Sequence, residues 1–346
     1  MPRLFFLVSG EHETLPFAEV EAVLEAENIA YKKPEKLPQI LRLETAVKTV
    51  KIVEKRAALT RICCQEILCC QASFAEIMKT LQHASLDSIL CPGESFVVRV
   101  HRVGEATRNL ASMDLERKIG ELILRKVKGV KVNLKQPLKT FFGAITGNSF
   151  LLGLKLAEIS PTPFMKRRPR NRPFFHPSAM LAKLARCMVN LATPRRGDLL
   201  LDPFCGTGSF LVEAGLIGCR AVGFDAKKHM VKGSMRNLKF FNIENDGVAV
   251  ADARYLPLTK VDCIVTDPPY GRSASTMGYT TGQIIQNFLA NVVDTIAKRQ
   301  RICLAAPKTV NVAEMGETVG FKHVQSHFVY VHRSLTREIA VLERRV

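Results

Sequence analysis

Residues 199–210 read LLLDPFCGTGSF. The three leucines form an apolar run of the kind that is buried on both faces of a parallel sheet. Gly206 and Gly208 then predict a tight turn in which a ligand approaches backbone amides at the N-terminus of the next helix. Because Leu211 replaces the third glycine of a GxGxxG loop, and because no Gly-Lys-Ser or Gly-Lys-Thr follows, dinucleotide and P-loop sites are both disfavoured.

The same alternation of apolar runs and helical stretches continues toward the end of the chain. It predicts an α/β fold with a Rossmann-like, seven-stranded, mainly parallel sheet. Ligands of such sheets bind beyond the carboxyl ends of the strands, so the residues that follow each strand are the candidate site. A helix is expected at residues 179–191, and strands at residues 198–201, 221–224, 247–250, 262–266, 302–305, 323–331 and 338–342.

Carboxylates follow three of the expected strands. Asp225 is placed to accept both hydroxyls of a ribose, and Asp252 either accepts from an adenine amino group or anchors a turn. Acidic strand ends suit a neutral or cationic nucleoside, which favours S-adenosyl-L-methionine over cofactors that carry phosphate. The predicted cofactor-binding residues are Asp202, Pro203, Phe204, Cys205, Gly206, Thr207, Gly208, Asp225, Ala226, Asp252 and Ala253.

A further strand ends in the sequence IVTDPPYG at residues 264–271. Taken alone, this is either an ordinary turn or a rigid reaction centre, because consecutive prolines fix the backbone beside Asp267. The DPPY motif resembles that of class I amino-methyltransferases, in which it binds an exocyclic amine. A nucleobase amine is a poor nucleophile, since its lone pair is delocalised into the ring. If the Asp267 carboxylate and the Pro268 carbonyl accept its two N–H groups, the lone pair can point at a sulfonium methyl, while Tyr270 stacks on the extruded base. The predicted catalytic residues are Asp267, Pro268, Pro269 and Tyr270.

The cysteines play no part in this chemistry. Transfer to nitrogen needs no nucleophilic thiol, so Cys205 and Cys263 are expected in the core. The 10 cysteines lack the spacing of a zinc site or the density of a disulfide framework, which predicts no metal and a reducing compartment.

The N-terminal part predicts a mixed α/β region with no catalytic signal of its own. The segments VRVHR at 98–102, LERKIG at 115–120 and VKVNL at 130–134 resemble a THUMP domain, an RNA-binding module of tRNA-modifying enzymes. The resemblance implies a ferredoxin-like α+β domain at residues 1–60 and a THUMP α+β domain at residues 61–158. A basic linker at residues 159–176 and a methyltransferase domain at residues 177–346 would follow.

Positive charge is concentrated near this linker. Residues 161–196 carry 9 Lys and Arg and no Asp or Glu, half of the net charge of +18. Such a field favours a nucleic-acid backbone as partner, although a solvated hinge would look similar. The prolines among these charges predict an extended segment. The RNA-binding residues predicted from this charge are Arg167, Arg168, Arg170, Arg172, Lys131 and Lys135.

The order of these motifs resembles the archaeal THUMP-domain tRNA guanosine-10 N2-methyltransferase family. The resemblance implies methyl transfer from S-adenosyl-L-methionine to N2 of guanosine in tRNA, once or twice, and places His176 beside the pocket, where a buried structural histidine is the alternative. The family resemblance implies Arg272, Arg333 and Arg337 as further RNA-binding residues, although a solvated edge strand would look the same for Arg333 and Arg337. It also implies tRNA as partner, a candidate small zinc-binding activator subunit, and otherwise a monomer. A DNA adenine-N6 methyltransferase and a non-catalytic RNA-binding factor remain alternatives. No apolar run is long enough for a membrane helix, and a cytoplasmic protein is expected.

Overall fold

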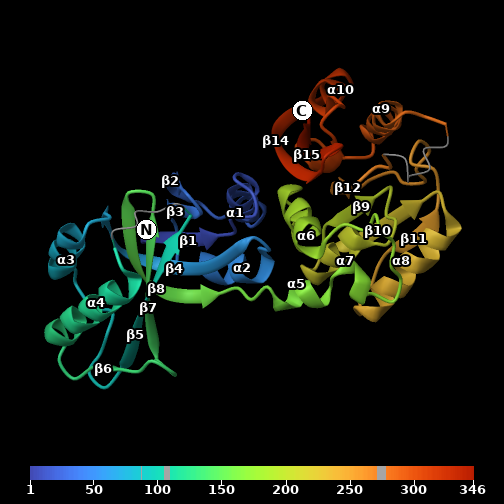
Figure 1. The fold of residues 1–346 in the computed structure, drawn as a ribbon. Coiled ribbons are helices and arrows are strands. Elements are labelled where there is room, and N and C mark those ends of the chain that lie inside the picture. Colours follow the sequence, from blue (N-terminus) through green and yellow to red (C-terminus); the bar gives the residue numbers. More distant parts are fainter. Residues whose placement is uncertain (87, 105–109, 271–277) are drawn as a thin grey trace. The chain divides into compact units, whose positions relative to one another are not determined.

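Residues 1–86, 88–104, 110–270 and 278–346 are described by a computed structural model of the chain (Figure 1). The chain divides into two units. The first takes in Met1–Phe17, Ile29–Glu54 and Thr60–Ser160, and the second takes in Ala18–Asn28, Lys55–Leu59 and Pro161–Val346. No helix within the described ranges combines the length and the apolar character needed to cross a membrane.

The second unit contains a seven-stranded sheet in the order β11-β10-β9-β12-β13-β15-β14. The first five strands are parallel, and β15 pairs antiparallel with both β13 and β14. This arrangement confirms the Rossmann-like, mainly parallel sheet expected from the alternating pattern. The strands are β9 (Leu199–Asp202), β10 (Arg220–Asp225), β11 (Gly247–Val250), β12 (Cys263–Thr266), β13 (Arg301–Pro307), β14 (Phe321–His332) and β15 (Leu335–Arg344).

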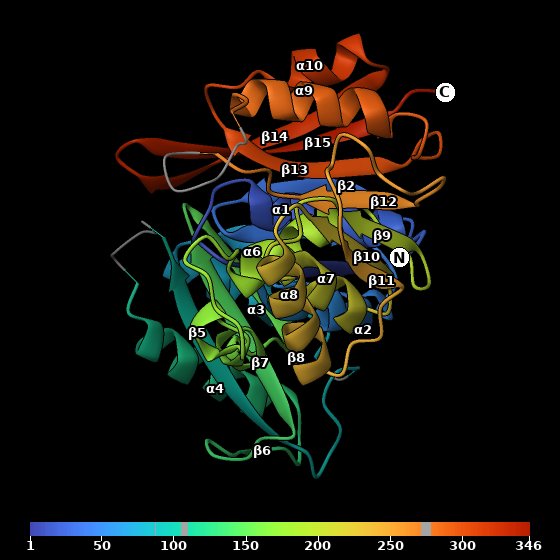
Figure 2. The same cartoon turned by 90° about the vertical axis from the view of Figure 1, so that its right-hand side faces the viewer.

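Helices cover both faces of this sheet (Figure 2). On one face lie α6 (Ala182–Leu191), α7 (Ser209–Leu216) and α8 (Lys228–Phe240), and on the other lie α9 (Thr281–Val292) and α10 (Val312–Thr318). Helix α9 buries Ile285, Phe288 and Leu289 at helical spacing against the sheet. It begins at a capping box formed by Thr280 and Gln283, which satisfies backbone donors of its first turn.

The segment expected to be an extended basic linker contains a short helix, α5 (Thr162–Lys166), and a 3-10 turn, η1 (Pro169–Asn171). The expectation of an extended segment is therefore wrong. Pro163 lies in the first turn of α5, where a missing N–H is tolerated, and the Arg167 guanidinium donates two hydrogen bonds to Glu213, at 2.8 and 3.0 Å. Local charge repulsion is thereby offset by a buried carboxylate.

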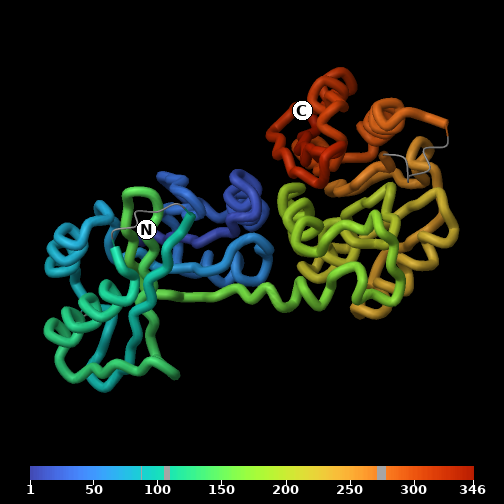
Figure 3. The backbone as a smooth tube through the Cα atoms, in the orientation of Figure 1, coloured from blue at the N-terminus to red at the C-terminus, as the bar shows by residue number. Residues whose placement is uncertain are grey.

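The first unit is built on one eight-stranded sheet in the order β2-β3-β1-β4-β8-β7-β5-β6. Helices α3 (Phe74–His83) and α4 (Ser112–Lys126) pack on the face of its second half. Figure 3 follows this path through the blue and green part of the tube. The strands are β1 (Arg3–Val8), β2 (Lys32–Leu37), β3 (Ile40–Glu44), β4 (Thr60–Gln71), β5 (Ser95–Val103), β6 (Lys131–Val132), β7 (Lys139–Thr146) and β8 (Ser149–Glu158).

The expected boundary between residues 60 and 61 falls at the start of β4, a strand in the middle of this sheet, and the division into two domains at that point stays a prediction. Helices α1 (Leu15–Ala26) and α2 (Thr49–Arg56) complete the N-terminal elements. Residues of α1 and of the segment after α2 belong to the second unit, where Glu19 accepts a hydrogen bond from Asn190 Nδ2 at 2.9 Å. Residues of the expected domain at 177–346 therefore pack against chain that precedes residue 177.

Candidate active site

Four parallel strands bring their carboxyl ends together at one cavity. Strands β10, β9, β12 and β13 are adjacent, and the cavity at their ends has a volume of about 1250 Å³. The cavity is lined by every predicted cofactor-binding and catalytic residue except Gly208, namely His176, Asp202, Pro203, Phe204, Cys205, Gly206, Thr207, Asp225, Ala226, Asp252, Ala253, Asp267, Pro268, Pro269 and Tyr270. Residues far apart in sequence thus form one site.

The glycine turn after β9 has the geometry that its sequence predicts. Gly206 and Gly208 have φ of 49° and 77°, in the left-handed region that side chains rarely adopt. A Cβ at Gly208 would also lie 2.3 Å from the Ser234 hydroxyl oxygen. Gly208 therefore allows the turn to pack closely against Ser234. Helix α7, which follows the turn, has its N-terminus toward the site.

Asp225 at the end of β10 is held by two backbone amides. Its Oδ2 accepts from Gly206 N at 3.0 Å, and its Oδ1 accepts from Lys227 N at 2.8 Å. Each oxygen keeps a second lone pair for a ligand. The orientation fits acceptance of two neighbouring hydroxyl groups.

Asp202 at the end of β9 is buried and only half satisfied. Its Oδ1 accepts from Thr266 Oγ1 at 2.8 Å and from Phe204 N at 3.2 Å, while Oδ2 has no partner among the residues that the structure describes. Burial raises the pKa of Asp202 to about 8, and the charges of Asp225 and Asp267 act in the same direction. A cationic ligand beside this carboxyl group would favour its ionised form.

Asp252 follows β11 and anchors a turn, one of the two roles considered for it. Its Oδ1 accepts from Arg254 N at 2.9 Å and from Arg254 Nε at 3.0 Å, and this pairing lowers the pKa of Asp252. The Arg254 guanidinium in turn lies 4.5 Å from the centroid of the Tyr279 ring. Arg254 and Tyr279 both line the cavity. Sequence reasoning missed them, because neither belongs to a motif.

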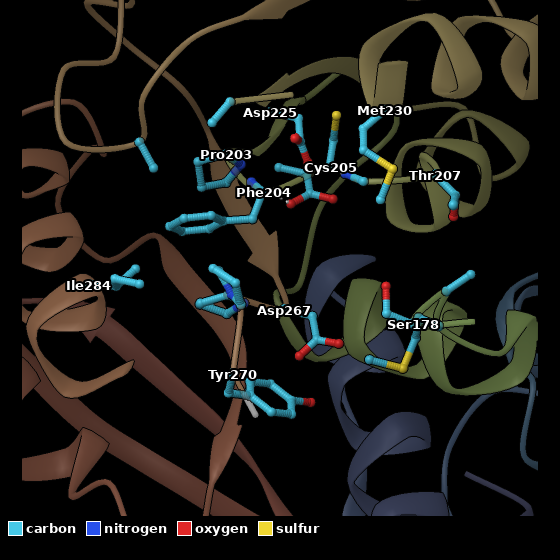
Figure 4. A pocket seen from close by; sticks show the side chains of 18 of the residues that line it. Ser178, Pro203, Phe204, Cys205, Thr207, Asp225, Met230, Asp267, Tyr270 and Ile284 are labelled. Atoms are coloured by element: carbon cyan, nitrogen blue, oxygen red, sulfur yellow. Dashed lines mark hydrogen bonds between the residues drawn. The ribbon is translucent and has the colours of Figure 1, made fainter. Parts of the chain in front are cut away.

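Asp267 lies at the end of β12, inside the cavity and close to Tyr270 (Figure 4). Its Oδ1 is buried and has no hydrogen-bond partner among the described residues. Burial raises the pKa of Asp267, while the nearby Arg337 guanidinium lowers it. Asp267 thus offers one unoccupied acceptor oxygen at the place expected to hold an amine.

Arg337, expected to touch RNA phosphate, lies in this cavity. Its Nε donates to the Tyr270 hydroxyl, its Nη1 donates to Met180 Sδ at 3.4 Å, and its Nη2 lies 3.7 Å from Asp267 Oδ2. The side chain is 15% exposed. The structure therefore corrects the expectation for Arg337. The pattern HRSLTR at 332–337 identifies the segment as functional, but it does not predict that the Arg337 side chain points into the cavity.

The segment before α6 supplies another wall of the cavity, as expected for His176. His176 Nδ1 accepts from Ser178 N at 3.3 Å and lies 2.7 Å from Ser178 Oγ, so the ring proton resides on Nε2. The segment is held by Asn237, which accepts from Phe174 N and donates to Phe174 O, both at 3.0 Å. Gly233 leaves room for the Phe174 ring.

The remaining predicted RNA-binding residues fall into two groups. Lys131, Lys135, Arg168, Arg170 and Arg333 are exposed, as a phosphate contact requires. Arg172 is 5% exposed, donating to Ser209 Oγ at 2.7 Å and to Arg167 O at 2.9 Å, and Arg167 is paired with Glu213. The expected phosphate contacts of Arg167 and Arg172 are therefore corrected to roles inside the fold. Arg272 lies outside the described residues.

Cys205 and Cys263 are buried, as expected for core residues, and burial raises the pKa of both thiols well above the usual value. A raised pKa keeps a thiol protonated and unreactive. The described residues contain no group of three or more His, Cys, Asp and Glu side chains that could hold a metal ion.

The carboxylate oxygens that line the cavity fit S-adenosyl-L-methionine. Within the described parts of the chain, Asp202 Oδ2 and Asp267 Oδ1 are buried acceptors without partners, and Asp225 holds two oxygens in a fixed orientation. Acceptors of this kind complement a cationic, hydroxyl-bearing nucleoside. The residues that would hold it lie at the ends of β9 and β10, next to the DPPY loop.

Comparison with known proteins agrees with this site. Residues 169–338 match the family described as "RMKL-like, methyltransferase domain". Residues 76–236 also match a family described as "DNA methylase", a range that ends before the DPPY loop. The chain is 37% identical to the tRNA (guanine(10)-N2)-dimethyltransferase of Methanothermobacter thermautotrophicus, covering 99% of both chains.

Two further similarities extend over nearly the whole chain. The chain is 31% identical to the tRNA (guanine(10)-N2)-dimethyltransferase of Methanocaldococcus jannaschii, covering 98% of this chain and 99% of that one. The crystal structure of TrmN from Thermus thermophilus shares the fold, with a TM-score of 0.55 and 20% identity over 99% of both chains.

Proposed function

This chain belongs to the family of tRNA (guanine(10)-N2)-dimethyltransferases, and we propose that it methylates N2 of guanosine 10 in tRNA, in two successive rounds. Its cofactor is S-adenosyl-L-methionine, and its reaction class is tRNA guanine-N2 methylation. The structural observation that carries the proposal is the buried Oδ1 of Asp267, which has no partner among the described residues and lies in a cavity that Pro268 also lines.

The side chains of the cavity divide the work between holding and orienting. The cofactor, when bound, supplies a methyl group on a positively charged sulfur. Asp225 and Asp202 hold its nucleoside and cationic parts, since they present fixed acceptors at the ends of β10 and β9. Asp267 Oδ1 and the Pro268 carbonyl accept the two N–H groups of the guanine amine, which directs the nitrogen lone pair into the cavity. We propose that Tyr270 packs on the extruded base.

RNA is the favoured substrate class over DNA. The full-length relatives are named for tRNA, and the first unit presents Lys131 and Lys135 as exposed cations. The match to a DNA methylase family does not include Asp267, so it does not favour base methylation in DNA. A non-catalytic RNA-binding role would leave the acceptor geometry of Asp225 and Asp267 without a purpose.

The proposal includes the setting of the enzyme. We place it in the cytoplasm, where its free cysteines would stay reduced. We further propose that it is a monomer that binds tRNA directly. Full activity of the purified chain would show that a zinc-binding activator subunit is dispensable, whereas activity that depends on adding such a subunit would show the opposite.

Methyl transfer to defined transcripts tests the proposal. The purified chain would be incubated with labelled S-adenosyl-L-methionine and tRNA transcripts carrying G or A at position 10. We expect label in the G10 transcript alone, recovered as N2-methylguanosine and N2,N2-dimethylguanosine. Label in double-stranded DNA, or no label in either transcript, would contradict it.

A further inference from the structure

Arg337 reaches the reaction centre from the antiparallel end of the sheet. It lies on β15 opposite Pro307, the last residue of β13, so its side chain extends from the edge at which the parallel strands end. Its guanidinium contacts three different groups: Tyr270 through Nε, Met180 through Nη1 and Asp267 through Nη2. A planar fork of donors is the feature that distinguishes arginine from lysine at such a junction.

Arg337 contacts both Tyr270 and Asp267. The Tyr270 hydroxyl oxygen accepts from Arg337 Nε, so the hydroxyl proton remains available to another acceptor. Nη2 of Arg337 approaches Oδ2 of Asp267 at 3.7 Å, while Oδ1 has no partner among the described residues. One carboxylate oxygen therefore faces the arginine, and the other is left for a substrate.

The charges around Asp267 explain why the Arg337 guanidinium is important for its ionised form. Asp202 on the neighbouring strand β9 interacts unfavourably with its charge, and Arg337 is the cation that lowers its pKa. The other charged or titratable groups that line the cavity are His176, Cys205, Asp225, Lys227, Asp252, Arg254, Tyr279 and His332. Asp252 and Arg254 neutralise each other as an ion pair.

From this geometry, and resting on the proposed function, we propose that Arg337 is a positioning residue: it fixes the Asp267 carboxylate and the Tyr270 ring so that Oδ1 faces the guanine amine. This role takes the place of the contact with RNA phosphate that the sequence had suggested for Arg337. Each of the three guanidinium nitrogens has a partner within the described residues, and the side chain is mostly buried, so Arg337 presents less of its fork to a phosphate than an exposed arginine does.

The test compares variants of the full chain. For Arg337→Gln we expect kcat at pH 7 to fall by about 100-fold, the effect of a small misplacement of reacting groups. The dissociation constants for S-adenosyl-L-methionine and for tRNA should change less than about twofold. Because Arg337 lowers the pKa of Asp267, its loss should move the acidic limb of the kcat profile to higher pH. Arg337→Lys keeps the charge and should restore the position of that limb, but only part of the rate.

Two further variants separate positioning from RNA binding. Arg345→Gln, an exposed arginine near the C-terminus, is the control and should leave both kcat and the pH profile unchanged. Arg333→Gln is the reference for an exposed cation that contacts phosphate, and should weaken tRNA binding with a shallower salt dependence. Weaker tRNA binding by Arg337→Gln, with kcat and its pH profile intact, would overturn the positioning role.

Three results can be told apart: a variant that does not fold, a wild-type chain that does not methylate tRNA, and a folded variant in which Arg337 proves unnecessary. If Arg337→Gln does not fold, Tyr270→Phe removes the hydroxyl and keeps the ring, and it should lower kcat without weakening cofactor binding. A wild-type rate for Tyr270→Phe would then count against the proposed link. Absence of methyl transfer by the wild-type chain would refute the proposed function, whereas normal transfer by both variants would refute the positioning role alone.

Discussion

Thr266 donates its hydroxyl hydrogen to Oδ1 of Asp202 across 2.8 Å. The bond joins the last residue of β12 to the last residue of β9, the strands that carry the DPPY loop and the glycine turn. Because both groups are buried, the bond holds the two loops at a fixed spacing. The proposed cofactor and base sites are therefore parts of one rigid edge.

Asp202 should make the stability of the free protein depend on pH. Its pKa is about 8 in the fold against an ordinary value of 3.8, so ionisation is disfavoured in the fold, and stability falls as pH rises from about 4 to 8. Asp202→Asn removes this cost and should raise Tm at pH 8, where the gain in the free energy of unfolding is at most about 6 kcal/mol, with no gain near pH 4. Thermal melts across this range test it, with the exposed Asp294→Asn as control. A gain that does not vary with pH would contradict it.

The same carboxyl group should couple cofactor binding to proton release. A cationic cofactor favours ionised Asp202, so affinity for S-adenosyl-L-methionine should increase from pH 6 to pH 8 and then level off. Calorimetry in two buffers of different ionisation enthalpy would detect the released proton. Asp202→Asn should bind with little pH dependence, and an unchanged dependence in that variant would exclude Asp202 as the source.

Asp267→Ala should abolish methyl transfer while cofactor binding survives. The variant removes the unpartnered Oδ1 that we assign to the guanine amine, and loss of one transition-state contact of this kind costs about 100-fold to 1000-fold in kcat. Asp267→Asn keeps an acceptor oxygen of the same size and should retain more activity than Asp267→Ala. Single-turnover rates and calorimetry measure the two effects. Equal loss of cofactor affinity would assign Asp267 to cofactor binding instead.

Glu213 should be essential for stability rather than for chemistry. It is fully buried on α7 and accepts from Arg167 at 2.8 Å and from Arg186 at 2.8 Å. Removing its charge leaves buried guanidinium groups unpaired, which costs about 3 to 5 kcal/mol. Urea denaturation of Glu213→Gln measures this loss, and the exposed Glu244→Gln should unfold like the wild type. Similar midpoints for both variants would refute the role of the pair.

Exposed arginines of the η1 segment should set the salt dependence of tRNA binding. Arg168 and Arg170 are exposed, whereas Arg167 and Arg172 are held in the fold. Arg168→Gln with Arg170→Gln should weaken tRNA binding and reduce the slope of log affinity against log salt by about one to two. Filter binding between low and moderate salt gives the slope, and an unchanged slope would remove the segment from the RNA interface.

The sequence predicts the second unit well, because its signals are local. Leu199–Leu201 is an apolar run followed by the glycine turn, and Cys263–Val265 is an apolar run followed by the DPPY motif. The apolar runs predict buried parallel strands, and the motifs after them predict which edge of the sheet carries the site. Strand β2 was not anticipated: Lys32–Leu37 is polar and mostly exposed, and it forms a strand only because β3 pairs with it.

Side-chain direction was harder to predict than strand position. Arg337 and Arg172 both belong to basic segments, and composition alone assigns them to the surface. Their partners, Tyr270 and Ser209, lie 67 and 37 residues away in sequence, so tertiary pairing decides their burial. The position of Tyr279 in the cavity could not be predicted from the sequence, because it depends on contact with Arg254 from another loop.

Nucleoside mass spectrometry of tRNA after reaction tests the central claim most directly. With S-adenosyl-L-methionine and a transcript carrying G10, the account predicts N2-methylguanosine that converts with time to N2,N2-dimethylguanosine, mapped to nucleotide 10 by nuclease digestion. Modification of another base, of another atom of guanine, or of no nucleoside at all would contradict it.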